Sequence, residues 1–77
     1  MKAISAKIVG VSKVKKFNNK NGKEFERQSL FVQFENTDVV GSAVAQVDIY
    51  SDFNHSVNEE VSIVYDRSKF KYDLLEF

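Results

Sequence analysis

Apolar residues alternate with polar ones along most of this chain, and the spacing typical of an amphipathic helix is hard to find. Alternation with a period of two indicates strands that bury one face and leave the other in water. Five short antiparallel strands are predicted. They cover residues 3–16, 23–35, 43–50, 60–66 and 69–77.

The alternation also predicts which residues face the core. They are Leu30, Val32 and Phe34 in the second strand, Ala43, Ala45, Val47 and Ile49 in the third, Val61, Ile63 and Tyr65 in the fourth, and Phe70, Tyr72 and Leu74 in the fifth. In the first strand Ile4, Ala6, Ile8 and Val14 share one face, whereas Val9 and Val11 lie on the other. Valines on both sides of Gly10 leave the first strand apolar on both faces, which indicates a bend or a bulge there. Asn21-Gly22, within the turn 18–22, predicts a hairpin. A small closed five-stranded OB-type barrel, or an SH3-like one, is the expected fold, because closure removes exposed sheet edges.

The composition limits how such a fold is stabilised. Seventy-seven residues make a single OB-type domain over 1–77 with a marginal core. The chain has no cysteine and one histidine, so no disulfide, thiolate site or multi-histidine metal site is expected, and no cofactor. Association into a homodimer is therefore expected. The opening MKAISAKIVG has no apolar run long enough for a signal peptide or a membrane span, so a soluble cytoplasmic protein is expected, with no membrane partner.

The charges are segregated along the chain although the net charge is zero. Residues 1–27 hold eight Lys or Arg and two acids, whereas residues 28–66 hold seven acids and no Lys or Arg. A basic cluster of this kind attracts a polyanion even in a neutral protein. The alternative is a solvated edge, since lysines also prevent unwanted strand pairing.

Aromatic rings interleave with these cations, as a single-stranded nucleic acid requires. Phe25, near the tip of the hairpin, is expected to stack on a base. Phe31 shares the outer face of a regular strand, but the favoured reading is that a bulge rotates it inward or that it packs against a second subunit. Phe70 is expected in the core, with its neighbouring lysines lining a groove. The candidate nucleic-acid-binding residues are Lys13, Lys15, Lys16, Lys20, Lys23, Phe25, Arg27, Phe31, Lys69, Phe70 and Lys71.

Catalytic chemistry has little support in the sequence. His55 has Asp52 nearby, but no motif positions a Ser or Cys nucleophile, so a surface histidine is the expected reading. Glu59 and Glu60 are adjacent in a strand and point to opposite faces. No calcium-loop spacing and no glycine-rich phosphate loop is present. The protein is not expected to be an enzyme.

The segment NNKNGKEFERQSLFV at 18–32 resembles the basic hairpin of the small single-stranded-DNA-binding (helix-destabilising) proteins of filamentous phages and related mobile elements. The shared step is Gly22-Lys23-Glu24-Phe25, and EEVSIVYDRSKFKYDLLEF is similar to the closing hairpin of that family. The resemblance implies a dimeric OB-type barrel in which Phe25 stacks on bases and Lys15, Lys16 and Lys20 contact the backbone. It also implies that Lys69, Phe70 and Lys71 reach toward DNA held by a partner subunit. The chain departs from the family at Arg27, usually apolar, and at Glu24, usually proline.

The expected function is sequence-independent coating of single-stranded DNA in the replication of a phage or other mobile element, in the cytoplasm of a bacterial host. RNA remains a possible ligand. The alternative is a protein–protein interaction module, such as a phage-encoded inhibitor or adaptor, that binds an acidic partner surface. A third possibility is a barrel that only helps to assemble a larger complex.

Overall fold

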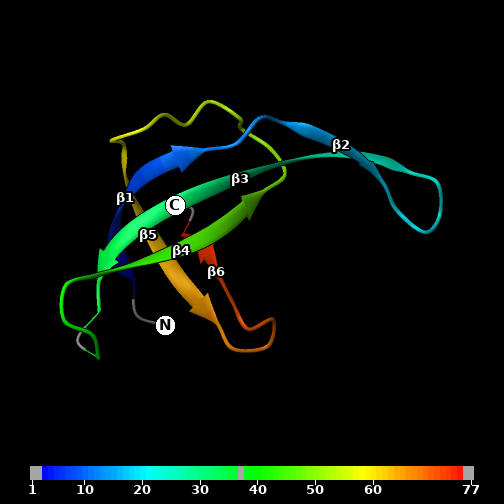
Figure 1. Cartoon of the computed structure of the whole chain (residues 1–77). Helices are drawn as coiled ribbons and strands as arrows, with labels where there is room; N and C mark the ends of the chain where they lie inside the picture. The colour runs from blue at the N-terminus through cyan, green and yellow to red at the C-terminus, as the bar shows by residue number, and fades with distance from the viewer. Residues whose placement is uncertain (1–2, 37, 76–77) are drawn as a thin grey trace.

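The computed structural model describes residues 3–36 and 38–75, and these form six antiparallel strands and no helix (Figure 1). The strands are β1 (Ile4–Val11), β2 (Lys15–Asn18), β3 (Glu24–Glu35), β4 (Ser42–Ile49), β5 (Glu60–Asp66) and β6 (Lys71–Leu74). The expected all-β antiparallel class is confirmed. The expected number of strands is wrong, because the segment predicted as one strand over 3–16 forms both β1 and β2. Within these described ranges, no helix is long and apolar enough to cross a membrane.

A bulge in β1 contributes to the separation of the predicted strand 3–16 into β1 and β2. The pairing of β1 with β3 shifts between Ile8 and Gly10, which makes Val9 the extra residue. Because the bulge moves the alternation by one position, Val11 packs against the same core as Ile8. A Cβ on Gly10 would lie 3.4 Å from the Phe31 ring, an ordinary van der Waals distance, so the space at the bulge does not by itself require glycine. The bend or bulge expected around Gly10 is confirmed.

Strand β3 is the strand with the most pairing partners in the sheet. Its first part pairs with β2, its later part pairs with β1, and its other edge pairs with β4. β1 pairs in turn with β5, and β5 pairs with β6. The edge strands β4 and β6 contact each other, but no ladder of backbone hydrogen bonds joins them. The described strands therefore form a curled sheet that is not closed into a barrel (Figure 1).

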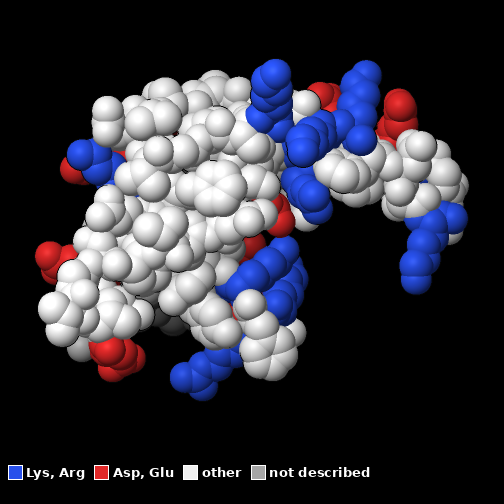
Figure 2. All heavy atoms as spheres, in the orientation of Figure 1, with Lys and Arg blue, Asp and Glu red and all other residues white. Residues whose placement is uncertain are grey.

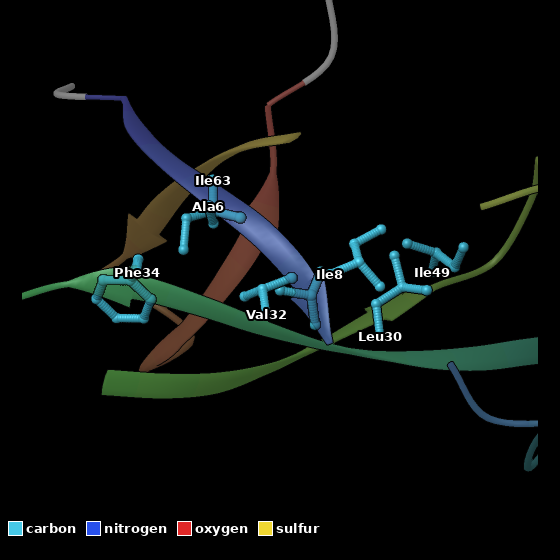
Figure 3. Close-up of a cluster of buried hydrophobic side chains, with 8 residues drawn as sticks. Ala6, Ile8, Leu30, Val32, Phe34, Ile49 and Ile63 are labelled. Atoms are coloured by element: carbon cyan, nitrogen blue, oxygen red, sulfur yellow. The ribbon is translucent and has the colours of Figure 1, made fainter. Parts of the chain in front are cut away.

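The core lies between the inner faces of β1, β3, β4 and β5 (Figure 3). Its buried members are Ala6, Ile8, Leu30, Val32, Phe34, Val47, Ile49 and Ile63. Six of the eight were predicted as core, and Ala6 and Ile8 were expected to share one face of the first strand. Complete burial of a large aliphatic side chain contributes about 1.5–3 kcal/mol. With so few buried side chains, each one matters to the stability of the fold.

Two predicted core residues, Tyr65 and Phe70, are exposed instead, as is Val14, which was expected on the same face as Ile8. Val14 is 38% exposed because β1 ends at Val11 and the chain crosses to β2 as a link. Tyr65 is 40% exposed and lies edge-on against the Tyr72 ring at 5.0 Å, outside the core. Phe70 is 82% exposed because it belongs to the turn 67–70, where its φ is +54°, and not to the strand predicted at 69–77.

Candidate nucleic-acid interface

The β2–β3 hairpin extends away from the body of the molecule (Figure 1). Its turn is held by Asn19, whose side-chain Oδ1 accepts hydrogen bonds from the backbone N–H groups of Asn21 and Lys23, each at 2.9 Å. Gly22 has a φ of +75°, which favours glycine. The hairpin predicted at 18–22 is confirmed, and Lys20 and Lys23 are exposed at its tip.

Two rings and two cations share one face of this hairpin. Phe17 pairs with Phe25, and Lys15 pairs with Arg27, so the four side chains leave the same side of the two strands. The two phenylalanine rings stack with their centroids 5.6 Å apart and their planes 21° apart. The Arg27 guanidinium carbon lies 4.3 Å from the centroid of the Phe17 ring, a cation–π geometry.

Tyr50, just after β4, extends this surface. Its ring centroid lies 6.1 Å from that of Phe25, and the residue is 53% exposed. We call Lys15, Phe17, Phe25, Arg27 and Tyr50 the aromatic–basic face. The sequence analysis did not include Phe17 and Tyr50 among the candidates. The pairing of Phe17 with Phe25 depends on a loop over 19–23. The expected turn at 18–22 would place Phe17 opposite Lys23, so the sequence carried no clear signal for Phe17.

Not every predicted lysine joins this face. Lys16 pairs with Glu26 on the opposite side of the hairpin, because consecutive residues of a strand alternate. Lys13 is exposed in the link between β1 and β2. Phe31 lies farther along β3, where it pairs with Gln46. At 38% exposed it faces outward, so the bulge does not turn it into the core.

The turn 67–70 forms a second basic projection. Asp66 Oδ1 accepts hydrogen bonds from Ser68 N–H at 2.9 Å and Ser68 Oγ at 2.6 Å, and these bonds lower the pKa of Asp66. Lys69 Nζ is 3.9 Å from Asp66 Oδ2, and the exposed Phe70 ring is flanked in sequence by Lys69 and Lys71. Figure 2 shows Lys and Arg gathered on this turn and on the hairpin, with a hollow between the two.

A cavity of about 270 Å³ lies at the seam where β4 and β6 meet without pairing. Its lining consists of Asp48, Ile49, Tyr50, Ser51, Lys69, Lys71, Asp73 and Leu74. Tyr50 belongs both to this lining and to the aromatic–basic face. The rings of the hairpin are therefore continuous, through Tyr50, with the lysines of the second projection.

Asp48 is one of three acidic residues near these cations, together with Asp73 in the same cavity lining and Asp66 beside Lys69. Asp48 Oδ1 accepts hydrogen bonds from Ser29 Oγ at 2.8 Å and Gln46 Nε2 at 3.1 Å. Partial burial alone would raise the pKa of Asp48. The hydrogen bonds from Gln46 and Ser29, together with the charges of Arg27 and Lys71, outweigh that effect and lower the pKa. Asp48 is therefore ionised at neutral pH.

A larger groove, of about 1040 Å³, is lined mainly by parts of β1, β3 and β5 and by the loop after β4, and it shares Ile49, Ser51 and Leu74 with the smaller cavity. His55 borders it, and its Nδ1 is 2.6 Å from Glu59 Oε2, so Glu59 and not Asp52 is its partner. In residues 3–36 and 38–75, no three His, Asp or Glu side chains are grouped as a metal site requires. The groove brings no such cluster together, whereas the aromatic–basic face gathers rings and cations on one surface.

No family model, curated protein or solved structure matches the chain. The resemblance of the hairpin to that of small phage proteins therefore rests on the quoted residues alone. What supports a function is the geometry of the aromatic–basic face and of the second projection beside it.

Proposed function

We propose that the protein binds and coats single-stranded DNA, with little sequence preference, along the aromatic–basic face. The observation that carries this proposal is the placement of three rings and two cations from β2, β3 and the end of β4 on one outward surface. Stacking on aromatic rings tolerates any base, because every base has a π face. Lysine and arginine supply affinity for phosphates without reading the sequence.

The second projection extends the surface along which single-stranded DNA would bind. A single strand that stacks on Tyr50 reaches the seam lined by Lys69 and Lys71, and the exposed Phe70 ring beyond it. The hollow in Figure 2 lies between these two sets of cations. Two basic projections separated by a hollow suit a flexible single strand better than a rigid duplex, because the strand can bend into the space between them.

The strand order supports an OB-type assignment. If β2 is counted as the continuation of β1, five strands remain, and the first pairs with both the second and the fourth. The third and fifth, β4 and β6, lie side by side without a ladder. An OB fold is a partly open five-stranded barrel that binds oligonucleotides through the connections between strands one and two and between strands four and five. Here those connections are the basic hairpin and the turn 67–70.

A homodimer belongs to the same proposal. Phe31 and Val44 are 38% and 63% exposed on neighbouring positions of the outer face of β3 and β4, where a second copy would cover them. Sedimentation at micromolar concentration is expected to report a dimer. A monomer at that concentration would contradict this part of the proposal while leaving nucleic-acid binding open to its own test.

Fluorescence polarisation tests the binding itself. The full chain is titrated into labelled oligo-dT, oligo-rU and a DNA duplex, at about 50 and 200 mM salt. We expect micromolar or tighter binding of oligo-dT, weaker binding of the duplex and a steep loss of affinity with salt. Tighter binding of oligo-rU would assign RNA as the ligand. A flat titration up to millimolar protein would overturn the proposal and favour the interaction module, which binds an acidic protein surface instead.

A further inference from the structure

We infer that Asp48 is a determinant of affinity in this interface, a fixed carboxylate whose charge lies near Arg27 and Lys71 and opposes the approach of a phosphodiester group. The inference rests on the proposed function. On this view the protein carries a negative charge within its basic surface, and that charge lowers the affinity for nucleic acid.

The position of Asp48 carries the first part of the argument. Asp48 faces outward on β4, which lies between β3 and β6. On one side it pairs with Ser29, and Arg27 is the next residue of β3 on the same face. Diagonal neighbours of this kind are within reach of a long side chain. On the other side, Lys71 lines the same cavity as Asp48.

The hydrogen bonds of Asp48 carry the second part. Ser29 Oγ and Gln46 Nε2 both donate to Oδ1, and Gln46 Nε2 also lies 3.2 Å from Ser29 Oγ, so three side chains brace one another. In the described ranges no hydrogen bond engages Oδ2, and no ion pair joins Asp48 to Arg27 or Lys71, so its charge acts on these cations through space. The neutral donors therefore fix the position of the carboxylate, but they do not compensate its negative charge.

The negative charge of Asp48 is expected to lower the affinity for phosphate groups. A phosphate that approaches Arg27 or Lys71 is repelled by the nearby negative charge of Asp48. Without that charge, the affinity for an oligonucleotide rises. The salt dependence also steepens, by about 0.7 in the logarithmic slope for each added phosphate contact to a single strand.

Asp48→Asn tests this in the full chain, because asparagine keeps the shape and the acceptor oxygen for Ser29 while removing the charge. Asp38→Asn is the matched control. It makes the same change of net charge at an exposed position in the β3–β4 connection, at the end of β3 opposite the hairpin (Figure 1). Fluorescence polarisation with oligo-dT is expected to show Asp48→Asn binding about two- to fivefold tighter, the scale of an exposed charge pair, with a steeper salt slope. Asp38→Asn is expected to bind like the parent protein.

Equal gains in both variants would reduce the effect to net charge and overturn the inference, as would unchanged or weaker binding by Asp48→Asn. If the parent protein binds no oligonucleotide, the proposed function fails, and the NMR signal of the Arg27 side-chain Nε–Hε group then tests Asp48 by itself. We expect that signal to shift in Asp48→Asn but not in Asp38→Asn, without nucleic acid present. A signal that stays in place would show that the charge of Asp48 does not act on Arg27.

Discussion

Lys15 and Lys16 are consecutive in β2, yet their side chains leave opposite faces of the β2–β3 hairpin. Lys15 pairs with Arg27 beside the stacked phenylalanines, whereas Lys16 pairs with Glu26. Two residues that contribute equally to the net charge are therefore in very different positions relative to the proposed interface. Only Lys15 is placed to contact a strand that stacks on the rings.

The first prediction follows from that difference. Lys15→Gln is expected to weaken oligo-dT binding and to reduce the logarithmic salt slope by about 0.7, because one phosphate contact is lost. Lys16→Gln removes the same charge from the other face and is expected to leave the slope unchanged. Polarisation titrations over a series of salt concentrations measure both. Equal losses in the two variants would show that the hairpin attracts nucleic acid only through its total charge.

The second prediction concerns Tyr50, which the structure adds to the interface. Tyr50→Ala is expected to weaken oligonucleotide binding by about 1–3 kcal/mol, the contribution of one stacked base. Tyr65→Ala is the matched control, since Tyr65 is also exposed but pairs with Tyr72, on the face of the β5–β6 hairpin opposite Lys71. Thermal unfolding of both variants verifies that each is folded. If Tyr65→Ala weakens binding as much as Tyr50→Ala, the oligonucleotide does not follow the proposed surface through Tyr50.

The residues that the sequence predicted correctly are those determined by local pattern. Leu30 and Val32 are buried because they occupy one face of a regular strand, and Asn21-Gly22 forms a turn because its backbone preferences favour one. Gly10, between Val9 and Val11, was enough to indicate the bulge. It did not indicate where the chain would pair with the second predicted strand again. The division of the segment 3–16 depends on which part of β3 each half meets, and that is a long-range property.

The errors have the same physical origin. Phe70 was assigned to the core on the assumption that the last strand begins before it, whereas the hydrogen bonds of Ser68 to Asp66 extend the turn through Phe70. The contact of Tyr50 with Phe25 depends on the register between β3 and β4, which the connection 36–41 determines. Alternation along one strand carries no information about that register.

The third prediction is a pH dependence of stability. The hydrogen bond from His55 to Glu59 Oε2, followed by that from Ser56 N–H to Oε1, lowers the pKa of Glu59 in the folded protein. The ionised form is thus favoured by folding, so this contribution to stability is fully present above the pKa of an unfolded glutamate, about 4.3. It is lost as the pH falls through the lower folded value.

Thermal unfolding between about pH 6 and pH 3 measures this effect. The loss of Tm on acidification is expected to be shallower in Glu59→Gln and in His55→Ala than in the parent protein. It does not vanish in either variant, because the pKa values of Asp48 and Asp66 are also lowered and these groups titrate in the same range. Curves parallel to that of the parent protein would show that the His55–Glu59 contact does not stabilise the fold in solution.

The fourth prediction separates stability from binding at Phe70. A phenylalanine with a φ of +54° is in the left-handed region, which costs an L-residue about 1–2 kcal/mol, and its ring is 82% exposed and contributes little to the core. Strain of this kind persists where the residue serves another purpose. Phe70→Gly relieves the strain, so a net gain in the free energy of unfolding of up to about 1 kcal/mol is expected after the flexibility of glycine in the unfolded chain is subtracted.

The same substitution removes the ring from the second projection, so oligo-dT binding is expected to weaken by about 1–3 kcal/mol while the protein becomes more stable. Asn58→Gly is the control, because Asn58 also has a positive φ, of +76°, but lies in the loop before β5, away from both projections. It is expected to leave binding unchanged. Denaturant unfolding and polarisation titrations on the same samples distinguish the outcomes. Weaker binding together with a large loss of stability would mean that the Phe70 ring is buried in solution, against a second subunit, and not displayed to nucleic acid.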